Sequence, residues 1–548
     1  MTHYRKPLHA PRGVCATSQP LAASAGLAAL RRGGTAVDAA IAAAVALTVV
    51  QPGSNDIGGD LFAIVWDGQR LHGLNASGRA PAALTRQAVL DAGPAPAATE
   101  AHGGAQADAT GHGAMPAVGW PSVTVPGAPA GWRDLHERFG RLPFADLFAD
   151  AIAYAERGYP VSPTVARGWA RGVERHATLV GEEFAEWRRV WTIGGRAPRP
   201  GERWRNPDAA RTLRLIAESY AEEFYHGEIA RALVEFSKRT GGFLAAEDLA
   251  GHSSTWVDPV CGHYRGYQVW ELPPNTQGLA ALIALQILDG MDLRDADEVE
   301  RRHVQIEAMK LAFADTHAYV ADPAHVDVPT AALLSPEYAR RRRAEIGPTA
   351  ADPRPGEPTR GGTVYLCTAD EDGMMVSLIQ SNYMGFGSFV ALPGYGFGLQ
   401  NRAAGFSLDP DHPNVVAPGK RPFHTIMPGF LTRDGEPVGP FGVMGGHMQP
   451  QGHVQVVLAT VDFGLDPQAA LDAPRWYWHT GRQVLLEELM TVGEQGAALV
   501  AGLRERGHEV TVAETGSPRF GFGQAIWRTD GGYVAGSEPR ADGCAVGY

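Results

Sequence analysis

Apolar residues recur every three or four positions through much of the first 340 residues, a spacing typical of helices that pack by one face. Near the start this pattern covers residues 20–32 and 36–49, and Thr35 is placed to cap the second helix. Residues 36–50 are apolar except for a few positions such as Asp38, and they fall short of the ~20 residues that a bilayer requires. We therefore predict a buried helix there. Similar patterns predict helices within residues 132–139, 144–158, 209–227, 279–288 and 303–320.

Alternating apolar and polar residues, which are typical of strands, become common later in the chain. Residues 61–77 predict two strands joined at Asp67-Gly68, and residues 267–274 predict another. Residues 363–383 alternate and turn at residues 370–373, which predicts a β-hairpin. Short strands, glycine turns and few helices are expected after it, so the chain has a helix-rich front and a strand-rich back.

Two segments depart from both patterns. Residues 91–120 are rich in Ala, Gly and Pro with almost no large apolar residue, and we expect a mobile surface loop. Residues 340–358 are charged and proline-rich, so we expect an exposed, flexible linker. This linker leads to Gly361-Gly362-Thr363, at the start of the predicted hairpin. Taken alone, that triplet is compatible with an ordinary turn.

Composition narrows the class of protein. With 548 residues, 44% hydrophobic and 20% charged, the chain has a globular composition. A net charge of −12 without a long basic run argues against a nucleic-acid partner or an anionic membrane surface. No apolar segment follows Arg5 and Lys6, so no secretory signal is expected. The four cysteines lack CxxC or zinc-type spacing, which favours reduced thiols and a cytoplasmic protein.

Several blocks give the junction at Thr363 a more specific meaning. They are ATSQPLAASAGLAALRRGGTAVDAAIAAAVALTVVQPGSNDIGGD at residues 16–60, PPNTQG at 273–278, TVYLCTADEDG at 363–373, KRPFHTIMP at 420–428 and MGGHMQ at 444–449. In this order they resemble the γ-glutamyltranspeptidase family of N-terminal-nucleophile hydrolases. The similarity covers nearly the whole chain apart from residues 91–120.

The resemblance implies a four-layer αββα sandwich built from two fragments of one precursor. The cut would fall between Gly362 and Thr363, giving a large subunit of residues 1–362 and a small subunit of residues 363–548. Thr363 would then be the nucleophile. The chemistry is reasonable because a free α-amine has a pKa of about 7.7–8.0 and can act as the base for the hydroxyl of the same residue. The preceding glycines allow backbone geometries that the self-cleavage step needs.

Further site residues follow from the same resemblance. Gly445 and Gly446 match the glycine pair whose N–H groups hold the oxyanion. Ser381 falls where the family has a threonine that hydrogen-bonds the nucleophile. Asn382 lies one place from the family's asparagine, a position that Tyr383 holds here.

The substrate pocket departs from a transpeptidase pattern. The segment that carries the family's acidic residues reads QNRAAGFS here, so both aspartates are lost and Arg402 is gained. His424 and Thr425 replace the serine pair that binds the α-carboxylate. The family arginine that binds the same group has no exact match, although Arg79 lies two residues away and is equally compatible with an exposed surface position. We expect a pocket with cations and no acidic partner, which disfavours an ammonium-bearing substrate.

These features make the chain look more like the oxamate amidohydrolase branch, which hydrolyses a small carboxylate-bearing amide. Two alternatives stay open: a γ-glutamyl hydrolase or transferase acting on glutathione-like amides, and an uncleaved, inert relative that only binds ligands. No cofactor is expected. His447 and His453 lack a third ligand at suitable spacing, so we predict no metal. Whether processed chains associate in pairs is left open.

Overall fold

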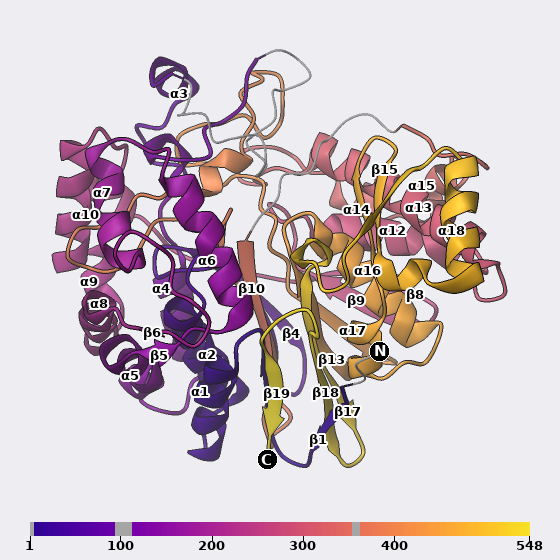
Figure 1. Ribbon diagram of the computed structural model, residues 1–548, viewed down its shortest axis with the longest axis horizontal. Helices are drawn as coiled ribbons and strands as arrows, with labels where there is room; N and C mark the ends of the chain where they lie inside the picture. The colour runs from indigo at the N-terminus through magenta and orange to yellow at the C-terminus, as the bar shows by residue number, and fades with distance from the viewer. Residues whose placement is uncertain (1–4, 94–111, 353–361) are drawn as a thin grey trace.

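Two antiparallel seven-stranded sheets pack face to face between two layers of helices in this computed structural model, which describes residues 5–93, 112–352 and 362–548 (Figure 1). In spatial order the first sheet contains β19 (Cys544–Gly547), β2 (Val14–Thr17), β10 (Gly362–Ala369), β11 (Met375–Tyr383), β3 (Asp60–Trp66), β4 (Leu71–Ala76) and β7 (Thr255–Val257). The second contains β1 (Leu8–Ala10), β18 (Gly532–Ser537), β17 (Phe522–Thr529), β13 (Glu436–Met444), β12 (Gly429–Arg433), β9 (Tyr267–Glu271) and β8 (Val260–Tyr264). This arrangement confirms the predicted αββα sandwich.

The outer layers come from different parts of the sequence, as their colours in Figure 1 show. The layer on the first sheet contains α1 (Pro20–Arg31), α2 (Ala36–Val50), α4 (Ala128–Phe139), α5 (Ala149–Arg157), α6 (Pro163–His176), α7 (Glu182–Trp191), α8 (Pro207–Glu218), α9 (Glu222–Tyr225), α10 (Glu228–Arg239) and α11 (Ala246–Ala250). The layer on the second sheet contains α12 (Gly278–Asp289), α13 (Glu298–Tyr319), α14 (Thr330–Leu333), α15 (Pro336–Arg343), α16 (Met448–Val461), α17 (Pro467–Asp472) and α18 (Gly493–Glu505).

Short elements complete the fold. They are α3 (Arg86–Asp91), the strand pair β5 (Tyr159–Pro160) and β6 (Arg203–Trp204), the three-stranded sheet of β14 (Trp476–Thr480), β15 (Gln483–Glu487) and β16 (Glu509–Ala513), and the 3₁₀ turns η2 (Trp120–Ser122), η3 (Phe144–Phe148), η4 (Arg402–Gly405), η5 (Glu488–Thr491) and η6 (Pro518–Phe520).

Helix α2 shows how local sequence and burial agree. Thr35 Oγ1 accepts from the Asp38 N–H at 3.2 Å, and the Asp38 carboxylate accepts from the Thr35 N–H at 2.9 Å, which satisfies two N–H groups at the helix start. All residues from Ala36 to Val50 are buried, because the helix contacts α1, α4, α5 and strands β10 and β11. The predicted cap and the predicted buried helix are both confirmed. Among the described residues, no helix has both the length and the apolar character to cross a bilayer.

The core between the two sheets positions the strands that carry the candidate site residues. Tyr365 and Ile379 of the first sheet belong to the same buried cluster as Phe430 and Ile526 of the second. A Cβ on Gly442 of β13 would lie 2.5 Å from the Tyr365 ring, so the two backbones approach closely there. Thr363 lies two residues before Tyr365 on β10. Strand β13 ends at Met444, two residues after Gly442. Strands β10 and β13 therefore pack against each other across the core.

Two sequence predictions need correction. Most of the low-complexity segment lies outside the described residues, but Met115, Val118 and Trp120 at its end are buried, so that part is not a surface loop. Residues 340–343 lie in helix α15, where Arg342 pairs with Asp315 at 2.7 Å, rather than in a flexible linker. The back of the chain is rich in strands and has few helices, as predicted, and one of these helices, α16, is buried as part of the outer layer.

Candidate active site

The predicted nucleophile occupies an irregular position in the middle of the first sheet. Gly362 of β10 pairs with Tyr383 of β11, and Val364 pairs with Gln380, so the register shifts at Thr363. Such a bulge re-aims one side chain while the ladder continues on either side. Thr363 is fully buried, and its Oγ1 lies 3.2 Å from Ser381 Oγ. The structure thus brings together Thr363 and Ser381, which are 18 residues apart in the chain.

Ser381 connects Thr363 to a cation. Its Oγ accepts hydrogen bonds from the Tyr383 N–H at 2.8 Å and from Arg402 Nη2 at 3.1 Å. In its contact with Thr363 Oγ1, either hydroxyl can be the donor. One serine hydroxyl thus lies between the Thr363 side chain and the Arg402 guanidinium.

Arg402 is a fully buried guanidinium beside this hydroxyl pair. Its Nη1 donates to Thr425 Oγ1 at 2.9 Å, and its Cζ lies 4.3 Å from the centre of the Tyr383 ring. Burial lowers the pKa of Arg402 to about 10, opposed by the nearby charge of Asp60, so the group stays cationic at neutral pH. Among the described residues its Nε has no hydrogen-bond partner. A buried cation with a donor to spare is suited to an anionic ligand.

Asp60 corrects the expectation that the pocket holds no acidic group. Its carboxylate is fully buried, accepts from the Gly78 N–H at 3.1 Å, and lies 3.1 Å from His424 Nε2. Burial raises the pKa of Asp60 to about 7, although the charge of Arg402 lowers it. Near neutral pH the Asp60 carboxyl is therefore close to half ionised, and it compensates Arg402 only in part.

His424 is neutral in this environment. Burial, together with the charges of Arg402 and Arg421, lowers the pKa of His424 well below its ordinary value. Its Nδ1 accepts from the Ile426 N–H at 3.4 Å, which leaves the ring proton on Nε2 to be donated to Asp60. His424 therefore holds the Asp60 carboxyl in place by a hydrogen bond and does not supply a second positive charge.

The glycine pair lies where β13 ends and α16 begins. Gly445 and Gly446 have φ angles of 138° and 63°, which residues with a Cβ rarely adopt. Within the described residues neither glycine N–H donates a hydrogen bond, whereas the Gly446 carbonyl accepts from Gln277 Nε2 at 2.9 Å. Gln277 also donates to the Thr425 carbonyl, so one side chain ties the glycine turn to the segment that carries His424 and Thr425.

Three buried polar atoms in and beside this cluster have no hydrogen-bond partner among the described residues. They are Gln277 Oε1, Arg402 Nε and His447 Nδ1. Similar atoms occur elsewhere in the described part of the chain, and the three named here are available to a polar ligand.

Two predicted binding residues lie apart from this cluster. The Asn382 backbone bonds to Ser54 and Asn401, and its side chain lies on the opposite face of β11 from Ser381 by strand alternation. Arg79 is half-buried, and its charge lowers the pKa of Arg421 and the pKa of His252. The roles proposed for these two residues stay predictions.

Three residues of this cluster, Asp60, Gln277 and Tyr383, were not predicted from the sequence. Asp60 ends the glycine-rich block at residues 51–60, and Gln277 lies in the PPNTQG block, so both were inside matched segments. The sequence could have indicated Asp60, because it is an acidic residue directly before an apolar strand. No local pattern could indicate that the Tyr383 ring would stack on Arg402.

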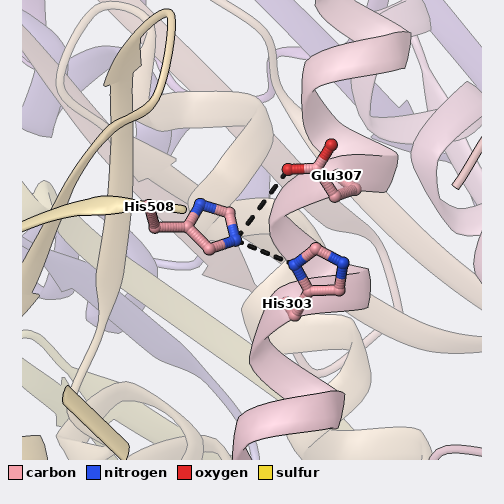
Figure 2. Close-up of side chains that lie close together, drawn as sticks. All are labelled: His303, Glu307 and His508. Atoms are coloured by element: carbon pink, nitrogen blue, oxygen red, sulfur yellow. Dashed lines mark hydrogen bonds and ion pairs between the residues drawn. The ribbon is translucent and has the colours of Figure 1, made fainter. Parts of the chain in front are cut away.

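A second cluster of ligand-type side chains lies in the other helix layer. His303 and Glu307 on α13 meet His508, which precedes β16 (Figure 2). His303 Nδ1 lies 2.9 Å from His508 Nε2, while His303 Nε2 lies 2.8 Å from the Gly347 carbonyl. His303 Nε2 therefore donates to the Gly347 carbonyl, and one proton is shared between His303 Nδ1 and His508 Nε2.

That proton arrangement argues for an anchor rather than a metal centre. The Lys310 ammonium lies 2.7 Å from Glu307 Oε1 and also donates to the Ala351 carbonyl at 2.9 Å. A cation in the cluster would have to displace the shared His508 proton and lie beside this ammonium. Glu307 also accepts from the Ala351 N–H, so the cluster holds residues 347–351, which lead toward the junction at Gly362.

Several known proteins are similar to this chain over nearly its whole length. The sequence profile of the family described as Gamma-glutamyltranspeptidase matches residues 22–548. The chain is 36% identical over 546 residues to the oxamate amidohydrolase proenzyme of Klebsiella pneumoniae, covering 98% of both chains. It is 35% identical over 533 residues to the glutathione hydrolase-like YwrD proenzyme of Bacillus subtilis, covering 96% and 97%. The crystal structure of cephalosporin acylase from Bacillus halodurans superposes with a TM-score of 0.92 at 50% identity, covering 99% of this chain and 97% of that one.

Proposed function

The chain belongs to the gamma-glutamyltranspeptidase family of N-terminal-nucleophile amide hydrolases, and from this premise we propose that it hydrolyses a small carboxylate-bearing amide of the oxamate type. The observation that carries the proposal is Arg402, a buried guanidinium that donates to Ser381 beside Thr363 and whose Nε has no hydrogen-bond partner among the described residues. A carboxylate next to the scissile carbonyl is the substrate group that such a cation would bind.

Maturation is the first step of the proposed mechanism. The Thr363 hydroxyl attacks the Gly362 carbonyl, and the peptide C–N bond breaks as an ester forms. Water hydrolyses the ester and leaves residues 1–362 and 363–548 as separate fragments. The register shift at Thr363 favours this attack, because a bulge releases the residue from regular pairing. The new α-amine then lies on the same residue as the nucleophile.

Amide hydrolysis follows the same course on an external substrate. The Thr363 oxygen forms an ester with the acyl carbon while its proton passes through the α-amine to the leaving nitrogen. The Gly445 and Gly446 N–H groups stabilise the oxyanion. Ser381 holds the Thr363 oxygen and Arg402 together, so it aligns the nucleophile with the bound carboxylate. Water then attacks the ester and releases the acid.

One observation favours the alternative, a γ-glutamyl hydrolase or transferase. Asp60 is a buried carboxyl near Arg402 and could pair with a substrate ammonium when ionised. Its hydrogen bond from His424 already occupies one oxygen, however, and its raised pKa reduces its charge near pH 7. The site is therefore better suited to bind a carboxylate on the acyl part of the substrate than to bind a substrate ammonium.

Two measurements test the proposal. Mass analysis of the purified protein should show fragments that meet at Thr363, and Thr363→Ala should leave one intact chain of 548 residues. The mature protein should release ammonia from oxamate with a higher kcat/KM than it releases the amine from a γ-glutamyl anilide. Faster anilide turnover would overturn the substrate assignment and leave the nucleophile standing. An intact, inert wild-type chain would contradict both.

A further inference from the structure

A cleft of about 460 Å³ opens beside the site and is lined by both prospective fragments. It reaches the glycine pair at Gly445 and reaches the end of β11 at Met384 and Gly385, just after Tyr383. Helix α6 and the segment around Arg519 both line the cleft. The cleft thus borders Gly445 and the residues that follow Tyr383, whereas Thr363 and Arg402 are themselves fully buried.

Helix α6 presents a line of arginines to this cleft. Arg167, Arg171 and Arg175 recur every four residues, so they share one face of the helix, and all three line the cleft. Gly168 lies among them, and a Cβ added there would meet no atom within 4 Å. The small residue thus keeps the middle of the cleft open between long cationic side chains.

The charges of this wall are not balanced. Asp542 is the one acidic residue that lines the cleft within the described part of the chain, and its carboxylate accepts from the Thr164 and Val165 N–H groups at the start of α6. The ion pairs of the described residues include none for Arg171 or Arg175. Like-charged groups so close together repel unless an anion binds between them.

Arg175 gives the clearest indication of a missing partner. Its Nε is buried without a hydrogen-bond partner among the described residues, and its Cζ lies 5.2 Å from the centre of the Phe389 ring. Burial lowers the pKa of Arg175, and no acidic side chain opposes the shift. Partial desolvation of its guanidinium and the neighbouring Arg167 charge likewise lower the pKa of Arg171, although the residue as a whole is exposed, with Glu174 opposing. For Arg175, the contact with the Phe389 ring holds the guanidinium at the cleft, where its N–H groups can bind an anion.

The order in which the two products leave determines which part of the substrate contacts these arginines. The acyl group stays on Thr363 as an ester until water arrives, so it must fit the buried end near Arg402. The amine part leaves first and needs a route to solvent, which the open cleft provides. Groups on the amine part therefore pass along α6.

We propose that the cleft along helix α6 binds a carboxylate on the amine part of the substrate through Arg171 and Arg175. The inference rests on the proposed function and deepens it: the substrate is an amino acid acylated on its amine, with one carboxylate on each side of the scissile amide. The amide C–N bond breaks, the acyl carbon bonds to the Thr363 oxygen, and the amino acid departs with the proton from that hydroxyl. Water then completes the hydrolysis without any further reactant.

The test compares matched pairs of substrates on mature protein. N-oxalyl derivatives of glycine, β-alanine and 4-aminobutyrate are each compared with the corresponding neutral terminal amide. For at least one chain length the acid should have a kcat/KM at least about tenfold above that of its amide, the factor expected from a charge-assisted contact. Arg171→Gln combined with Arg175→Gln should reduce this ratio to about one while ammonia release from oxamate stays unchanged.

Two controls separate binding from folding. Arg231→Gln removes one charge from an exposed position on α10 that does not line the cleft, and it should leave the acid-to-amide ratio intact. Arg171 is exposed, so Arg171→Gln alone should fold and mature normally and still lower the ratio. An equal rate for acid and amide in the wild type would overturn the inference, and so would a ratio that survives the double substitution.

A binding measurement distinguishes this failure from failure of the proposed function. Glutarate is titrated calorimetrically into the wild type, the double variant and Arg231→Gln. If no oxalyl amide is turned over, a loss of glutarate affinity confined to the double variant still supports the cleft site, while equal affinity in all three proteins overturns it. Normal oxamate turnover without any preference for the acids would refute the cleft site alone.

Discussion

Replacing Arg402 by Gln removes the buried cation on which the substrate assignment depends. In the structure this guanidinium donates to Ser381 at 3.1 Å and to Thr425 at 2.9 Å, and its Nε is left for a ligand. A hydrogen bond to a charged group contributes roughly 1.5–3 kcal/mol. At 1.4 kcal/mol per factor of ten, kcat/KM for oxamate should fall by about 10- to 150-fold.

The assay must separate loss of the carboxylate contact from general damage. Ammonia release is followed from oxamate and from acetamide, which lacks the carboxylate, and maturation is checked by electrophoresis. The expected loss is confined to oxamate and lies mainly in KM. Without Arg402 the pKa of Asp60 should rise above about 7, because the charge that lowers it is gone; Asp60 then takes up a proton, which limits the cost to folding.

Arg402→Lys provides the matched control. It keeps a charge but lacks the planar fork that contacts two hydroxyl groups, so it should lie between the wild type and Arg402→Gln. If Arg402→Gln slows oxamate and acetamide by the same factor, Arg402 does not bind the carboxylate. An unchanged KM for oxamate would refute the reasoning as well.

Three further changes probe the same site. Ser381→Ala should lower kcat by about 10- to 100-fold with a smaller change in KM, since the lost hydroxyl aligns Thr363 rather than binding substrate; a change confined to KM would contradict this role. Asp60 is neutral below its pKa of about 7 and anionic above it, so the Ki of oxalate should rise about fivefold (~1 kcal/mol) between pH 6 and pH 8. Asp60→Asn should abolish that rise, and a pH profile identical to the wild type would argue against Asp60 as the titrating group. Gly445→Ala forces a Cβ onto a φ of 138° and should reduce kcat by 10²- to 10³-fold, as expected for a misplaced oxyanion donor, while the Ki of oxalate stays constant.

The local elements could be predicted because their signals are local. The cap at Thr35, the buried helix from Ala36 to Val50 and the hairpin beginning at Thr363 depend on neighbouring residues and on a simple periodicity, and the structure has all three. Helix α16 was not anticipated, because its sequence contains Pro450 and Gly452 and lacks a one-sided apolar pattern. Gly452 is accepted there since its missing Cβ allows the helix to pack on Val443.

The site divides in the same way. Thr363, Ser381, Gly445 and Gly446 could be selected from matched segments, since each lies within or beside a short block with a recognisable order. The ionisation of the charged groups near these residues depends on the tertiary structure. Asp60 and Arg402 are 342 positions apart in the numbering, and only sheet packing buries them in one environment where each changes the pKa of the other.

Sequence by itself determined the order of the elements, the buried faces and the residue types available for catalysis, because these follow from periodicity and side-chain chemistry. Tertiary structure alone decided that His424 is neutral, that Asp60 partly offsets the pocket cation, and that the arginines of α6 face an open cleft. Ionisation and ligand preference depend on burial and on which charges meet. Those are properties of contacts between distant segments, which no local pattern along the chain records.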